Sequence, residues 1–62
     1  MNENWLQKYY INELAEASSA FLEHTKLAKE VHDDNMTHQL QQARQYDIDR
    51  MFILCKLIKE LK

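Results

Sequence analysis

The chain contains neither glycine nor proline among its 62 residues, and this absence constrains the fold more than any other feature. β-Hairpins and irregular loops depend on these residues, because glycine reaches positive φ angles and proline fixes tight turns. Long α-helices avoid both, since each destabilises a helix interior. The abundant Leu, Ala, Glu, Lys and Gln favour helix as well. The sequence therefore predicts an all-α protein.

A chain of this length forms at most one domain, residues 1–62, and its core is marginal without reinforcement. Small domains gain stability from disulfides, a bound metal or association. The single cysteine, Cys55, cannot form an intrachain disulfide, and no zinc-ligand spacing surrounds it. Association is the reinforcement that remains. A reduced thiol in an apolar run, and the lack of a signal peptide or a transmembrane apolar stretch, predict a cytoplasmic location.

Two apolar stripes with the 4,3 spacing of packed helices divide the chain. The first consists of Leu6, Tyr10, Leu14, Ala17, Phe21, His24, Ala28 and Val31. The second consists of Met36, Leu40, Ala43, Asp47, Met51, Leu54, Ile58 and Leu61. Because one straight helix cannot absorb the change of phase between them, the chain must turn where they meet.

The polar residues between the stripes, Asp33–Asn35, favour caps and turns over helix interiors. We therefore expect one helix over about residues 4–32, a turn at about 33–35 and a second helix over about 36–61. Asn4 is the expected N-cap of the first helix, and Asp34 or Asn35 that of the second. A short connection between long helices predicts an antiparallel helical hairpin.

Asp47 is the one charged residue in the second stripe, and it falls near the level of His24 on the facing helix. A buried carboxylate needs a hydrogen-bond partner or an opposite charge. His24 can be that partner, and such a pair can fix the register or the oligomeric state. The alternative is that Asp47 reaches solvent or pairs with Arg44 or Arg50 on its own helix.

The last stretch, Met51–Lys62, carries more apolar surface than one neighbouring helix can cover. We expect a second subunit or a partner to dock on the uncovered apolar residues at this end of the hairpin. These are Trp5, Tyr9, Phe52, Ile53, Cys55, Leu57 and Leu61. A weaker stripe on the other side of the first helix is either a second contact surface or a set of scattered exposed residues. It consists of Ile11, Ala15, Ser18 and Leu22.

Residue types that support enzyme chemistry are present but do not form a catalytic or metal-binding pattern. Cys55 has no histidine near it in the sequence that would promote a thiolate. The cluster of His32, Asp33, Asp34 and His38 lacks the spacing of helical ligand sets such as His-x-x-x-His. Two helices also form no substrate cleft. We therefore predict a non-enzymatic protein without catalytic residues, cofactor, metal or small-molecule substrate.

The preferred interpretation is a protein–protein interaction module, in which two hairpins form a coiled-coil-like four-helix bundle. Such a homodimer would serve as a regulator, an adaptor or an inhibitor of another protein. An alternative is an accessory subunit or co-chaperone that folds with a different helical protein. Whether two hairpins would pack parallel or antiparallel stays open.

Nucleic-acid binding and membrane binding are alternatives to this interpretation. The net charge of −2 argues against a basic nucleic-acid-binding module. An RNA-binding bundle, similar in architecture but not in sequence to the Rop-type plasmid regulators, is a further alternative. Its polar stripe would be Asn4, Lys8, Asn12, Ser19, Lys26 and Arg44. Binding to a membrane surface is disfavoured, because the apolar residues of the last helix surround it rather than occupy one face.

Overall fold

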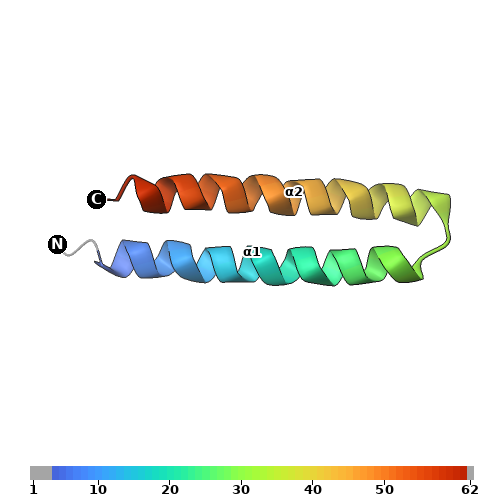
Figure 1. Cartoon of the computed structure of the whole chain (residues 1–62), viewed down its shortest axis with the longest axis horizontal. Coiled ribbons are helices and arrows are strands. Elements are labelled where there is room, and N and C mark those ends of the chain that lie inside the picture. Colours follow the sequence, from blue (N-terminus) through green and yellow to red (C-terminus); the bar gives the residue numbers. More distant parts are fainter. Residues whose placement is uncertain (1–3, 62) are drawn as a thin grey trace.

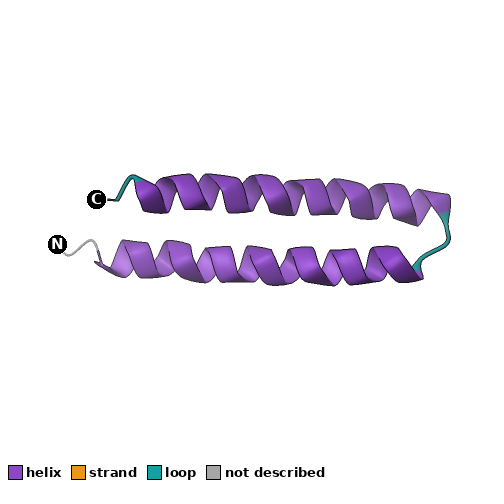
Figure 2. Cartoon of the chain, viewed as in Figure 1, coloured by secondary structure: helices purple, strands orange, loops and turns teal. Residues whose placement is uncertain are grey.

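The protein is an antiparallel pair of α-helices joined by a short turn (Figure 1). The computed structural model describes residues 4–61, with α1 spanning Asn4–Glu30 and α2 spanning Asp34–Lys59. Within these residues the chain contains only the two helices and short turns (Figure 2). The predicted all-α helical hairpin is confirmed. α1 begins at Asn4, the residue predicted to cap it, and the residues before it lie outside the described range.

The turn between the helices falls about two residues earlier than the sequence predicted. α1 ends at Glu30, and α2 is capped by Asp33 rather than by Asp34 or Asn35. The carboxylate of Asp33 accepts a hydrogen bond from the backbone N–H of Asn35 at 3.3 Å. Asp33 was not among the predicted caps, but its side chain caps helices as well as those of Asp34 and Asn35, so residue type alone does not distinguish the three positions. Asp34 then occupies the first turn of α2, where a negative charge suits the helix dipole.

The hairpin is long and thin. Its Cα atoms extend over 50 × 14 × 12 Å, with a radius of gyration of 14.5 Å. A compact chain of this length would have a radius of gyration of about 11 Å. The accessible surface is 5113 Å², whereas a compact monomer of the same mass would expose about 4,250 Å². A larger share of the chain is therefore in contact with solvent than is usual for a folded monomer.

The hairpin has very little core of its own. Among residues 4–61, the buried apolar side chains are Ala17, Leu40 and Leu54, and Asp47 is buried beside them. Most other residues of the two predicted stripes line the seam between the helices but stay half-buried, because no second layer covers them. Met36, next to the turn, is exposed. The stripes were therefore placed correctly, but two helices cannot remove them from water.

Among residues 4–61, side-chain contacts across the seam show how the helices are aligned. They include an ion pair, a hydroxyl–thioether hydrogen bond, a cation–π contact and a histidine–carboxylate hydrogen bond. Each joins residues within about one and a half helical turns of the predicted alignment. In order along α1, the contacts are Glu13–Arg50, Ser18–Met51, Phe21–Arg44 and His24–Asp47.

Candidate interaction surfaces

The structure brings together His24 and Asp47, the polar pair singled out in the sequence. His24 Nδ1 lies 2.6 Å from Asp47 Oδ2. Because a carboxylate offers only acceptors, the imidazole Nδ1–H is the donor. The Asp47 side chain is 5% exposed and that of His24 is 31% exposed, so the carboxylate is shielded while the imidazole still reaches water. This geometry satisfies the carboxylate inside the seam, as a buried polar group requires. A role in setting register or subunit number stays a prediction.

The two arginines that could have paired with Asp47 make other contacts instead. Arg50 forms an ion pair with Glu13 across the seam. The guanidinium carbon of Arg44 lies 5.4 Å from the centroid of the Phe21 ring, within the range of a cation–π contact. Arg44 therefore packs toward α1 and does not project from the polar stripe of the RNA-binding alternative, where the sequence had placed it.

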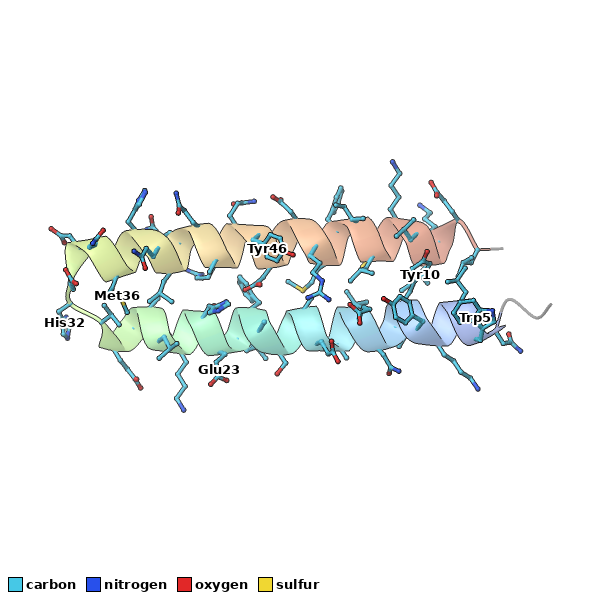
Figure 3. All side chains as sticks on the ribbon, turned by 180° about the vertical axis from the view of Figure 1, so that it is seen from behind. Trp5, Tyr10, Glu23, His32, Met36 and Tyr46 are labelled. Atoms are coloured by element: carbon cyan, nitrogen blue, oxygen red, sulfur yellow. The ribbon has the colours of Figure 1, made fainter. Side chains whose placement is uncertain are left out.

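The surface of the hairpin has two flanks, one on each side of the seam. The contacts across the seam show which residues of α1 and α2 share a flank. The flank that carries the Glu13–Arg50 pair is called the Tyr46 flank. Side chains three or four residues apart on a helix lie on one side. Tyr9 precedes Glu13 by four residues, and Tyr46 precedes Arg50 by four. The exposed apolar residues of the Tyr46 flank are Trp5, Tyr9, Leu27, Tyr46 and Ile53. Figure 3 looks onto this flank, where Trp5 and Tyr46 are labelled.

The opposite side of the seam is called the Phe52 flank, and it carries the contact between Ser18 Oγ and Met51 Sδ at 3.3 Å. Leu22 follows Ser18 by four residues, and Cys55 follows Met51 by four. Ile11, Leu22, Ile48 and Phe52 form the exposed apolar part of this flank, and Cys55 is an exposed free thiol beside them. Phe52 is 76% exposed. One apolar strip thus runs along both helices.

The two flanks divide the docking residues predicted from the sequence. Helical spacing places Trp5, Tyr9, Ile53 and the half-buried Leu57 on the Tyr46 flank. Phe52 and Cys55 lie on the other flank, so the structure does not join them to the N-terminal aromatic residues. Leu61, also half-buried, follows the end of α2.

The weaker stripe of the sequence prediction lies on the Phe52 flank, beside Phe52 and Cys55. Its members are Ile11, Ala15, Ser18 and Leu22, and two of them are exposed large apolar residues. Helical spacing thus places the stripe on the same flank as Phe52 and Cys55, and its role as a contact surface stays a prediction.

Sequence reasoning did not select Tyr46 and Ile48, two exposed apolar residues of α2. A signal for each was present. Ile48 begins a 4,3 series that continues to Phe52 and Cys55, and Tyr46 precedes Ile53 by seven residues. Both series lie outside the central stripe of α2, which dominated the interpretation of that helix.

The flanks also differ in charge. The Tyr46 flank carries glutamates along α1, at Glu13, Glu16 and Glu23, and Glu23 is labelled in Figure 3. On the Phe52 flank, the side chains within residues 11–25 and 41–55 include no acidic group, and their one charged member is Arg44. Around its middle the hairpin therefore has one acidic, aromatic side and one apolar side with a single cation, and Lys29 and Lys59 lie farther along the apolar side.

A metal site, a small-molecule site or a membrane span would each need a particular arrangement of residues in the hairpin. Across residues 4–61, no three His, Cys, Asp or Glu side chains lie close enough together to share a metal ion. A shallow hollow beside Phe52 and Cys55 also involves Lys56 and Lys59, so all its lining residues come from α2. Within the part of the chain that the structure describes, neither helix has the apolar length needed to cross a membrane.

Comparisons of the chain with protein-family models, curated proteins and solved structures found no match. A function for this chain therefore has to be inferred from the geometry of the hairpin. Its distinctive features are a slender fold, a small core and two exposed flanks of opposite character. These features leave both flanks open to contact with another molecule.

Proposed function

We propose that the protein is a non-enzymatic protein–protein interaction module whose hairpin self-associates into a four-helix bundle and acts as a homodimeric regulator or adaptor. The observation that carries this proposal is the apolar surface that the two helices leave exposed. Large apolar patches on small proteins mark interaction sites, because their contact with water is unfavourable. In this hairpin, exposed apolar residues remain on both helices although α1 and α2 already pack against each other.

The amount of uncovered surface is that of a protein interface. The hairpin exposes 5113 Å², roughly 850 Å² more than expected for a compact monomer of 7.5 kDa. A stable protein–protein interface of standard size buries about 800 Å² on each partner. One further contact of ordinary size would therefore give this chain the solvent exposure of a typical folded protein.

The pattern of the uncovered side chains fits a bundle. In a four-helix bundle each helix packs on more than one neighbour and needs apolar positions beside its first stripe. α1 has such a second series at Ile11, Ala15, Ser18 and Leu22, and α2 has one at Ile48, Phe52 and Cys55. Both series follow the 4,3 spacing of helices packed at shallow angles. A second hairpin would cover these positions and enlarge the small core.

The proposal is tested by thermal unfolding, followed by circular dichroism at increasing protein concentration. Association with a second copy stabilises the folded state by mass action, so the melting temperature should rise with concentration. For a protein of this size, the expected rise is on the order of 5 °C per tenfold increase in concentration. A cooperative melt with the same midpoint over about a hundredfold range of concentration would show that the lone hairpin is the stable unit, against the proposal.

A further inference from the structure

We infer that the Phe52 flank is the surface through which two copies of this chain join, and that the Tyr46 flank lies on the outside of the dimer. The assignment rests on the proposed function and adds the face of contact. The occupant of the Phe52 flank is a second copy of the chain.

Charge disfavours self-association through the Tyr46 flank. In a two-fold symmetric dimer the same patch of both subunits meets, so every charge on it is duplicated across the interface. Glu16 and Glu23 are exposed on the Tyr46 flank, while Arg50 is already paired with Glu13. Bringing two such surfaces together would place unpaired carboxylates in a desolvated contact, which is unfavourable.

The Phe52 flank has no such obstacle. Within residues 11–25 and 41–55 its side chains include no carboxylate. The one cation within these ranges, Arg44, is held over the Phe21 ring at 5.4 Å instead of extending from the surface. Symmetry would duplicate only Arg44 in this part of the Phe52 flank, whereas it would duplicate several carboxylates on the Tyr46 flank, so self-association through the Phe52 flank carries the smaller electrostatic penalty.

The shape of the Phe52 flank also suits close packing. Large apolar side chains, Ile11 and Leu22 on α1 and Phe52 on α2, lie around the small residues Ala15 and Ser18. Small residues let a neighbouring helix approach closely, and bulky side chains can then fill the space around them. Phe52 is the most exposed of the large apolar residues in the described chain, at 76%, and has the most to gain from burial.

The assignment is tested with a matched pair of variants, Phe52→Glu and Tyr46→Glu. Both replace an exposed aromatic residue of α2, 76% and 66% exposed respectively, by the same charged residue. Sedimentation equilibrium should give a dimer dissociation constant at least about 100-fold higher for Phe52→Glu, because a charge is buried in the interface. For Tyr46→Glu, the dissociation constant should stay within about threefold of the wild-type value.

The possible outcomes separate the two proposals. A monomeric wild-type protein would overturn the proposed function and this assignment together. If the wild-type protein is a dimer, a Phe52→Glu variant that still dimerises would overturn the assignment alone. A Tyr46→Glu variant that is monomeric would do the same. Because Phe52→Glu can prevent folding if the hairpin needs its partner, a second measurement uses the unaltered chain.

The chain provides one reporter on each flank, since it has a single cysteine and a single tryptophan. Cys55 lies on the Phe52 flank, and Trp5 lies on the Tyr46 flank. As the protein concentration rises through the dimerisation range, labelling of Cys55 by a soluble thiol reagent should slow at least about tenfold. Quenching of Trp5 fluorescence by acrylamide should change far less, because the Trp5 side chain is already 56% exposed in the hairpin. Protection of Trp5 with unchanged Cys55 labelling would overturn the assignment.

Discussion

The hydrogen bond between His24 and Asp47 predicts that replacing one partner destabilises the protein more than replacing the other. The two side chains are 31% and 5% exposed, so removing either partner leaves the other in a different environment. His24→Leu leaves a carboxylate that water cannot readily reach. Asp47→Leu leaves an imidazole that can turn its polar atoms to solvent. We therefore expect His24→Leu to lower the free energy of unfolding more than Asp47→Leu does.

The expected magnitudes follow from this difference in exposure. Leaving one member of a buried pair without its partner typically costs about 3 to 5 kcal/mol, so His24→Leu should cost about 3 kcal/mol. Asp47→Leu loses a hydrogen bond with a net value of about 1 to 1.5 kcal/mol. Burial of a leucine side chain, worth about 2 kcal/mol, offsets that loss. The free energy of unfolding of Asp47→Leu should therefore stay within about 1 kcal/mol of the wild-type value or exceed it.

The assay is urea unfolding followed by circular dichroism, with all variants at one protein concentration because association contributes to stability. The double variant His24→Leu/Asp47→Leu should recover most of the stability lost in His24→Leu, with a coupling energy of about 2 kcal/mol. Asp49→Ala is the control, because Asp49 makes an exposed hydrogen bond with Gln45 at 3.0 Å. It should change stability by less than about 0.5 kcal/mol.

Equal destabilisation by the two single substitutions, or a coupling energy below about 0.5 kcal/mol, would refute this reasoning. A second readout of Asp47→Leu concerns assembly. If the pair sets the oligomeric state, as polar core residues can in helical bundles, Asp47→Leu should raise stability and change the number of subunits. Raised stability with an unchanged subunit number would exclude that role.

Two further predictions concern single contacts. Asp33→Ala should lower the free energy of unfolding by about 1 kcal/mol through loss of the cap, whereas Asp34→Ala should cost less; equal effects in urea unfolding would contradict the assignment of the cap. Arg44→Ala should lower the free energy of unfolding by about 0.5 to 1 kcal/mol through loss of the contact with Phe21. Arg44→Met keeps much of the apolar stem, so it measures how much of that loss comes from packing of the stem. Full stability of Arg44→Met would show that the charge over the ring contributes nothing.

The hairpin itself was predictable because several independent signals agree. The lack of glycine and proline, the change of stripe phase after Val31 and the polar run at Asp33–Asn35 all indicate two helices with a short turn. The level of His24 opposite Asp47 followed from the position of that turn. An error of about two residues in the turn left the alignment of the helices largely intact, because the contacts depend on helical period rather than on the capping residue.

The arrangement of the flanks could not be obtained in the same way. Helical period shows that Phe52 and Ile53 point about 100° apart, on either side of the second stripe. It does not show whether Trp5 and Tyr9, on the other helix, lie beside Phe52 or beside Ile53. That choice requires contacts across the seam, which the Glu13–Arg50 and Ser18–Met51 pairs supply.

The measurement that most directly tests whether this chain folds by self-association is sedimentation equilibrium of the unaltered protein. A homodimer predicts a mass twice the 7.5 kDa of the chain, with dissociation on dilution accompanied by loss of helical circular dichroism. A mass of 7.5 kDa at all concentrations, together with full helix content and cooperative unfolding, would contradict this account.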